Sequence, residues 1–341
     1  MPKQEGNHMP KQSLSQLETG PQQRAACETG LITGRRRFVT FAGGVVGLCA
    51  VGMPSWSADA AVKIKVGIIP TLSAAPIVLG VKKGIFASAG LDVSVETVQS
   101  AAAAVPALLN GELQFLESSS TPTIAALSNR IPVKVVGNET TMNDAQAILL
   151  VAPDGPKQLS ELEGKTVAVN ALKAFLQLAV QASVDGAGAD SRKVRFVELP
   201  FADMIGALKA GRVQAIAVPE PLSAIGQAQG LRVLSRVWQA MPKDAAAGWQ
   251  LVATSYAKAN PELVKEFQKA LKQSVDHARN NPDEVRAIVP TYMKIDPAIA
   301  GRLALPDYVP EVSIAATETL AKLMKKYGFI SGDLPEDWLV R

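Results

Sequence analysis

The sequence predicts an α/β fold built from two units of similar design. Short runs of β-branched residues alternate with longer helical stretches, a pattern typical of sheets flanked by helices. The turn sequence Pro153-Asp154-Gly155-Pro156 divides this alternating region in two. Segments 107–114 and 207–214 match each other as helix–glycine–strand corners, one in each unit, and this repetition favours two related lobes.

The first 60 residues are predicted to be an export signal that is cleaved from the mature chain. Residues 34–40 carry a twin-arginine motif, an uncharged stretch follows over 41–53, and residues 58–60 form a small-x-small cleavage site. The stretch is shorter than the roughly 20 apolar residues that span a bilayer. We therefore expect a periplasmic protein, which has no access to ATP or reduced nicotinamide.

Two details of this signal leave alternatives open. Thr40 stands where the twin-arginine pattern usually has lysine, so the general export route remains an alternative. The tetrad at residues 1–4 recurs at residues 9–12, so translation could also start at Met9.

Composition excludes several classes of protein. Cys27 and Cys49 both lie in the signal, so the mature chain is expected to have neither disulfides nor thiol chemistry. His277 is the only histidine beyond the signal, which argues against a zinc site and against a Ser-His-acid catalytic set. The net charge is only +4, without the clustered basic residues of nucleic-acid-binding surfaces. No cofactor and no catalytic residue are predicted.

The first unit is expected to begin with a strand over 63–69, where Ile64, Val66 and Ile68 share one face. Glycine and asparagine end its helices, and Pro132 precedes one of its strands. Its further strands are expected at 92–98, 114–117, 133–137 and 147–151, and its helices at 75–83, before Asn110, and at 121–129.

The second unit repeats this alternation in a shorter form, and a helical region follows it. Its strands are expected at 166–169, 194–198, 215–218 and 231–234, and its helices at 174–187, 201–210 and 221–229. One more strand is expected at 250–254, after which the chain is expected to be purely helical. Asn260-Pro261-Glu262 is typical of a helix start, and the last helix should end at Gly328.

Several motifs, in this order, resemble the ABC-transporter substrate-binding proteins. They lie at residues 67–70, 80–93, 110–115, 131–136, 159–169, 218–221 and 260–264. The most similar branch binds nitrate, alkanesulfonates, taurine and thiamine-pyrimidine precursors, and the resemblance covers residues 63–327. Gln114 and Gln214 stand where that family usually has aspartate, and we interpret both as structural.

This resemblance implies a type II periplasmic-binding-protein fold, with two lobes joined by two crossover strands around a ligand cleft. The crossovers are expected near 147–151 and 250–254, so lobe 1 would combine residues 61–150 with 250–341 and lobe 2 would hold residues 151–249. The implied partners are a small-molecule ligand and an ABC permease with its ATPase. The protein would be a monomer that meets the membrane only through the permease.

Polar loops at the predicted carboxyl ends of strands are the candidate ligand site, because ligands of open α/β sheets bind there and helix N-termini favour anions. Each candidate also has a structural interpretation: the serines could cap a helix, the lysine could be solvated, and the tryptophan could belong to the core. The candidates are Thr71, Ser73, Ser118, Ser119, Ser120, Thr121, Asn138, Asn170, Lys173, Glu220 and Trp249.

These features favour a solute-binding protein that closes its lobes on a small organic anion, such as an alkanesulfonate, a taurine-like compound or a carboxylate, and delivers it to a permease. One alternative ligand is a neutral or aromatic heterocycle such as a thiamine pyrimidine precursor. Another alternative is a ligand-sensing module for a sensor kinase. An enzyme of the same fold, a pyrimidine-precursor synthase, relies on a cysteine-rich motif that the mature chain lacks.

Overall fold

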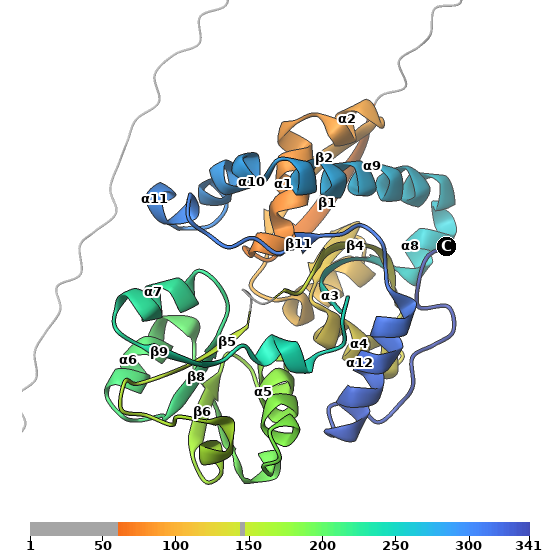
Figure 1. Ribbon diagram of the computed structural model, residues 1–341. Coiled ribbons are helices and arrows are strands. Elements are labelled where there is room, and N and C mark those ends of the chain that lie inside the picture. The colour runs from red at the N-terminus through yellow and green to blue at the C-terminus, as the bar shows by residue number, and fades with distance from the viewer. Residues whose placement is uncertain (1–60, 144–146) are drawn as a thin grey trace, which may run out of the picture. The chain divides into compact units, whose positions relative to one another are not determined.

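The computed structural model describes residues 61–143 and 147–341, which fall in one compact unit (Figure 1). The predicted export signal, its cleavage site and both cysteines lie outside the described residues. None of the helices described is long and apolar enough to cross a membrane.

Six strands form the first sheet, in the order β11-β4-β10-β3-β1-β2. β1 is parallel to β2 and β3, whereas β10 is antiparallel to β3 and β4. Their bounds are β1 Val62–Ile68, β2 Leu91–Thr97, β3 Phe115–Ser118, β4 Val133–Thr141, β10 Ala246–Ala253 and β11 Asp307–Tyr308. The expectation of a purely helical C-terminal region is wrong at β11, whose two residues are too few to show a strand periodicity.

Five strands form the second sheet, in the order β7-β6-β8-β5-β9. Their bounds are β5 Ile148–Val151, β6 Thr166–Val169, β7 Arg195–Glu198, β8 Ala215–Val218 and β9 Arg232–Ser235. β5 and β8 are buried along their whole length, as continuous apolar runs in a sheet covered on both faces should be.

The chain passes from one sheet to the other twice. The first passage lies between the end of β4 at Thr141 and the start of β5 at Ile148. The second lies between the end of β9 at Ser235 and the start of β10 at Ala246. Both passages lie a few residues upstream of the crossover segments expected from the sequence.

Helices cover both sheets (Figure 1). The α-helices are α1 Ala75–Lys82, α2 Ile85–Ser88, α3 Ala101–Leu109, α4 Ser120–Ser128, α5 Phe175–Gly186, α6 Phe201–Lys209, α7 Leu222–Ala228, α8 Thr254–Ala259, α9 Pro261–Asn280, α10 Pro282–Ile288, α11 Pro297–Ala300 and α12 Ile314–Lys326. Short 3-10 helices are η1 Leu72–Ala74, η2 Leu159–Leu162, η3 Ser191–Lys193, η4 Val237–Ala240 and η5 Val289–Thr291.

The core of the first sheet divides into two apolar clusters. Phe115 of β3 stacks on Phe267 of α9 with 3.6 Å between ring centroids, in the cluster that also contains buried residues of α1 and α10. Leu116, the next residue of β3, belongs to the other cluster, together with buried residues of α3, α4 and α12. Because side chains alternate along a strand, Glu117 returns to the side of Phe115.

The two glutamines that replace the family's usual aspartate have equivalent structural roles, as the sequence predicts. The Gln114 side chain accepts a hydrogen bond from the Lys65 amide at 2.8 Å and donates one to the Gly111 carbonyl at 2.7 Å. The Gln214 side chain accepts from the Thr166 amide at 3.1 Å and donates to the Gly211 carbonyl at 3.2 Å. Each glutamine therefore ties a helix–glycine corner to the neighbouring strand of its own sheet.

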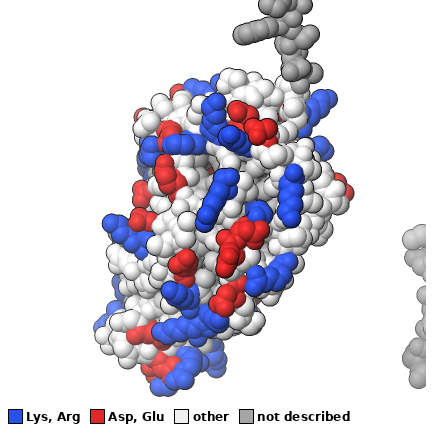
Figure 2. All heavy atoms as spheres, turned by 90° about the vertical axis from the view of Figure 1, so that its right-hand side faces the viewer, with Lys and Arg blue, Asp and Glu red and all other residues white. Residues whose placement is uncertain are grey.

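Acidic and basic side chains are interspersed over the face of the molecule shown in Figure 2. That face presents no extended patch of a single sign. It therefore lacks the basic stripe that marks a nucleic-acid-binding surface, in line with the low net charge of +4.

Candidate functional site

Polar residues gather where β1, β3 and β4 end. The Thr71 hydroxyl, just after β1, donates a hydrogen bond to Oε1 of Glu117 at 3.0 Å. The hydroxyls of Ser73 and Thr140 lie 2.8 Å apart and hydrogen-bond to each other. The structure thus brings together residues that lie far apart along the chain, at the edge of the sheet where the sequence predicts a ligand site.

Gly248 allows residues 69–74, the loop that contains η1 and is called the η1 loop below, to pack closely against β10. A Cβ added at Gly248 would lie 2.7 Å from Cβ of Ser73 and 3.2 Å from Oγ1 of Thr140. A contact of 2.7 Å is shorter than side chains tolerate, so a larger residue here would displace the loop.

The N-terminus of α4 carries two hydroxyls without a partner. Ser120 and Thr121 are 0% and 1% exposed, and neither hydroxyl has a hydrogen-bond partner among the described residues. Ser119 occupies the N-cap position, yet its side chain makes no capping hydrogen bond. The hydroxyl of Ser118 instead contacts Thr123 within the same turn, at 2.8 Å. The start of α4 therefore offers free backbone N–H groups beside unpartnered hydroxyls.

Trp249 and Asn138 lie opposite each other in the paired strands β10 and β4. The indole of Trp249 is fully buried and packs against Trp338, with 5.7 Å between ring centroids, while its Nε1 has no partner. The Asn138 amide donates to the Val309 carbonyl at 2.6 Å, and its Oδ1 accepts no hydrogen bond. Both side chains thus pack in the core and retain one unpartnered polar atom each.

The remaining candidates lie at the ends of strands in the second sheet. Asn170 and Lys173 are exposed after β6, and the backbone of Lys173 is left-handed, with φ of 55°. Glu220 is half-buried after β8, and its carboxylate accepts a hydrogen bond from the Ala224 amide of α7 at 3.3 Å. These residues belong to the opposite lobe from Ser120 and Thr121.

A buried acidic cluster lies behind the η1 loop. Glu117 of β3 and Glu139 of β4 are 3% and 0% exposed, and neither forms an ion pair with a described residue. Burial raises the pKa of Glu117 to about 8, and burial and repulsion by Glu117 raise the pKa of Glu139 well above its usual range. The Glu117 carboxyl accepts hydrogen bonds from the amide of Ile69 and the hydroxyl of Thr71. These two hydrogen bonds act to lower its pKa, against the larger effect of burial.

Two tyrosines also hold the η1 loop. The hydroxyl of Tyr292 donates to the Thr71 carbonyl and that of Tyr308 donates to the Leu72 carbonyl, each at 3.0 Å. Burial raises the pKa of both phenols, so both remain donors.

Sequence reasoning missed Glu117, Tyr292 and Tyr308. It also missed Gln250 of β10, whose side chain donates a hydrogen bond to Glu139 at 3.2 Å. A charged residue directly after Phe115-Leu116 in a predicted buried strand was the one available signal for Glu117.

A cavity of about 470 Å³ lies beside the two passages between the sheets. It lies within the size range of small-molecule sites. Arg236 and Lys243 give it two cationic side chains, and Asp244 and Asp307 give it two anionic ones. Thr141, Met142, Asn143, Trp238, Ala304 and Leu305 complete its lining. None of these residues was among the candidates from the sequence.

The described residues contain no group of histidine, cysteine, aspartate and glutamate that could hold a metal ion. His277 instead hydrogen-bonds to Glu284 at 2.8 Å.

The two sheets and the double passage between them give the chain the two-lobed fold of type II periplasmic binding proteins. The chain belongs to the NMT1/THI5-like family, whose model matches residues 72–285, more than half of the sequence. No curated protein sequence matches the chain.

Three solved structures illustrate the shared fold. The aliphatic sulphonate-binding protein SsuA of Escherichia coli is 17% identical, with a TM-score of 0.69, and the match covers 82% of this chain and 92% of that one. SsuA from Xanthomonas axonopodis pv. citri, bound to MOPS, is 18% identical, with a TM-score of 0.64 over 82% and 96% of the two chains. The nitrate-binding protein NrtA of Synechocystis is 14% identical, with a TM-score of 0.64 over 79% and 82%.

Proposed function

We propose that this chain is the solute-binding component of an ABC importer and that it captures a small organic anion between its lobes. The start of α4 carries this proposal, because the hydroxyls of Ser120 and Thr121 are buried there without partners and no side chain caps the helix. The fold shared with sulfonate-binding and nitrate-binding proteins supports it.

The chemistry of this helix start suits an oxyanion. Free N–H groups at a helix N-terminus and neighbouring hydroxyls donate hydrogen bonds to a sulfonate or carboxylate without the need for a buried cation. A bound oxyanion would accept hydrogen bonds from Ser120 and Thr121. Binding would then satisfy both the anion and two buried hydroxyls that lack partners in the free protein.

The opposite lobe and the passage that leads from it to β10 would supply positive charge. Lys173 is exposed before α5, and Arg236 and Lys243 line the cavity beside the passages between the sheets. A solute that contacts α4 on one side and these cations on the other favours the closed arrangement of the lobes by its greater affinity for that arrangement.

The remaining steps of the proposed role follow from that closure. The closed form would dock on a permease in the periplasm, as a monomer, after export directed by the N-terminal signal. The role is binding and delivery, and no bond of the solute is broken.

A second candidate ligand is a neutral or aromatic heterocycle. The buried Oδ1 of Asn138 accepts no hydrogen bond, and Glu220 is half-buried at a strand end. These acceptors suit the N–H groups of an aminopyrimidine better than they suit an anion. A sensing role would use the same site, and a sensor-kinase gene beside this one, in place of permease and ATPase genes, would favour it.

Calorimetric titration of the purified protein tests the anion proposal. The panel would contain ethanesulfonate, taurine, nitrate, benzoate and 4-aminopyrimidine, with thermal unfolding as a second readout because ligands that bind the folded state stabilise it. Binding of ethanesulfonate, taurine or benzoate supports the proposal. Binding of 4-aminopyrimidine alone favours the heterocycle, and no binding by any member contradicts both.

Two substitutions at α4 localise the site. Ser120→Ala and Thr121→Val should each weaken anion binding by about tenfold or more, the typical effect of losing a hydrogen bond to a charged group. The stability of the free protein should change little, because neither hydroxyl has a partner to lose. Thr319→Val removes an exposed hydroxyl from α12 and is the matched control, expected to leave affinity unchanged.

A further inference from the structure

Glu139 and Gln250 form a buried pair with one hydrogen bond made and one missing. Nε2 of Gln250 donates to Oε1 of Glu139 at 3.2 Å. The other atom of each group, Oε2 of Glu139 and Oε1 of Gln250, has no hydrogen-bond partner. Both residues are 0% exposed, so solvent does not supply the missing donor.

The two unpartnered atoms are both acceptors as long as Glu139 is ionised. A single proton on Oε2 of Glu139 converts that atom to a donor. Oε1 of Gln250 is an acceptor that lacks a donor. A carboxylic acid and a primary amide paired in this way form a cyclic dimer with two hydrogen bonds. One proton on Glu139 therefore gives a hydrogen-bond partner to both unpartnered atoms, Oε2 of Glu139 and Oε1 of Gln250.

The surroundings disfavour an ionised Glu139. Glu117 lies close enough to repel a negative charge on Glu139, and no described cation pairs with either carboxyl. Both oxygens of Glu117 accept hydrogen bonds, from the amide of Ile69 at 2.8 Å and from the hydroxyl of Thr71 at 3.0 Å. The carboxylate form thus fits Glu117 better than Glu139, which has one donor only.

The other titratable groups facing this pair do not supply a counter-charge. Tyr292 and Tyr308 are neutral phenols whose pKa burial raises further. The charge of Arg286 in α10 acts to lower the pKa of Tyr308. The guanidinium of Arg286 is itself hydrogen-bonded to Asp283 and to the Leu303 carbonyl.

We propose that Glu139 is a neutral carboxylic acid at neutral pH, paired as acid and amide with Gln250, and that it positions the solute-binding η1 loop. The second half of this inference rests on the proposed solute-binding function. Glu139 acts through Glu117, which holds Ile69 and Thr71 at the start of the loop. A charge on Glu139 would oppose ionisation of Glu117, which accepts hydrogen bonds from Ile69 and Thr71, and would so weaken the hold on Thr71.

Infrared difference spectroscopy of the whole protein tests the protonation state directly. The spectrum of the wild type minus that of Glu139→Gln at neutral pH should contain the carbonyl stretch of a protonated carboxyl, shifted to lower frequency in D₂O. Glu318→Gln, at an exposed site on α12, is the matched control and should remove only carboxylate bands. A Glu139→Gln difference spectrum with carboxylate bands alone would overturn the proposal.

A second measurement tests positioning by solute affinity at neutral pH. Ethanesulfonate is the probe for all variants. Glu139→Gln keeps one donor and one acceptor for Gln250 and should bind the probe within about threefold of the wild type. Glu139→Leu leaves the amide of Gln250 unpaired and should weaken binding by about tenfold or more.

The outcomes separate this inference from the proposed function. Equal affinity in Glu139→Leu and Glu139→Gln would refute the positioning role while the infrared result stands on its own. If the wild type binds none of ethanesulfonate, taurine and benzoate, the anion proposal and the positioning role both fail, and the infrared spectrum still decides whether Glu139 is neutral.

Discussion

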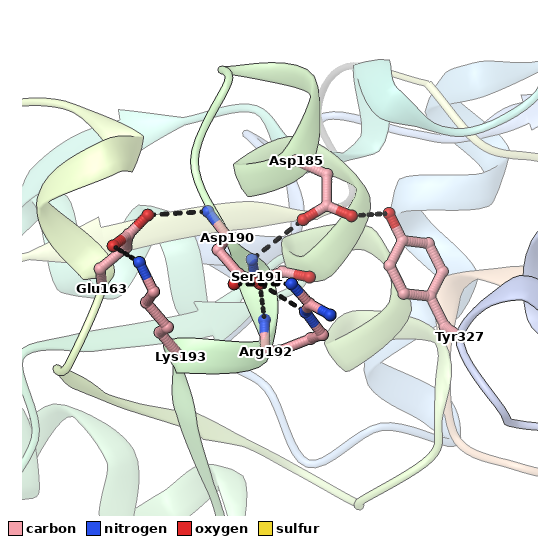
Figure 3. A network of polar contacts seen from close by, with 7 residues as sticks. All are labelled: Glu163, Asp185, Asp190, Ser191, Arg192, Lys193 and Tyr327. Carbon is pink, nitrogen blue, oxygen red and sulfur yellow. Dashed lines mark hydrogen bonds and ion pairs between the residues drawn. The ribbon is translucent and has the colours of Figure 1, made fainter.

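Tyr327, which follows α12, donates a hydrogen bond to Oδ2 of Asp185 in α5 at 2.8 Å (Figure 3). Asp185 also accepts from the amide of Ser191, through Oδ1 at 2.9 Å. This contact ties the C-terminal segment of the chain to the lobe built on the second sheet. The surrounding network adds the ion pairs Lys193–Glu163 and Arg192–Asp190. The cation of each pair is largely exposed, so each pair stabilises the fold only slightly.

Tyr327→Phe should destabilise the protein by about 1 kcal/mol at neutral pH, the usual net value of one hydrogen bond. Burial acts to raise the pKa of Asp185, but hydrogen bonds from Ser191 and Tyr327 outweigh it and leave the pKa below its usual range. The contribution of a carboxyl with a lowered pKa is present above its unfolded-state pKa and is lost as the pH falls through its folded-state pKa. The difference between wild type and variant should therefore shrink in acid.

Urea unfolding at neutral and acidic pH measures this difference. Tyr256→Phe is the matched control, because no hydrogen bond to a described residue involves the Tyr256 hydroxyl. A difference that stays constant down to strongly acidic pH would show that the Tyr327 contact does not depend on the charge of Asp185.

Glu139→Gln should change how stability depends on pH. The pKa of Glu139 is raised in the folded protein, so the folded state binds a proton that the unfolded state has released above about pH 4.5. Stability is therefore lost as the pH rises from there through the folded-state pKa. The variant lacks this proton, so its free energy of unfolding should fall less steeply with pH than that of the wild type. The two slopes should differ by about 1.4 kcal/mol per pH unit.

Denaturant unfolding between about pH 5 and about pH 8 gives these slopes. Glu318→Gln, at an exposed site, should retain the wild-type slope. Parallel wild-type and Glu139→Gln curves would mean that Glu139 has the same protonation in the folded and unfolded states.

The fold was largely predictable from local patterns, and the buried acid pair was not. The strand over 63–69 and the corners at Gln114 and Gln214 are fixed by residues close in sequence, so periodicity and glycine positions indicate them. The cluster of Glu117, Glu139 and Gln250 instead depends on β4, β10 and β3 being neighbours, an order unrelated to their order in the chain. Register shifts between β4 and β10 add a further displacement that no sequence pattern reveals.

The candidate site was predictable only as a set of loops. Strand-end hydroxyls indicated Ser120 and Thr121, because helix starts after strands are ready-made anion sites. The cationic lining of the cavity, Arg236 and Lys243, lies in a passage between sheets where neither helical nor strand periodicity applies. Its position follows from tertiary structure alone.

Gln114→Ala and Gln214→Ala should each destabilise the protein by about 1–3 kcal/mol, because each removes two hydrogen bonds at a corner. The two glutamines lie in different sheets and share no partner, so the double variant should show the sum of the two effects. Chemical denaturation of the two single variants and the double variant measures this. A double variant no less stable than either single one would show that the two corners do not contribute independently.

Gly248→Ala should impair solute binding as well as stability. Its Cβ would meet Cβ of Ser73 at 2.7 Å, so the η1 loop must move, at a typical overpacking penalty of about 1–3 kcal/mol. Gly206→Ala on the exposed side of α6 is the matched control, since nothing lies within 4 Å of its added Cβ. That control should be stabilised by up to about 1 kcal/mol, because alanine favours helix over glycine. Thermal unfolding and titration with ethanesulfonate test both variants, and unchanged affinity in a folded Gly248→Ala protein would remove the η1 loop from the binding site.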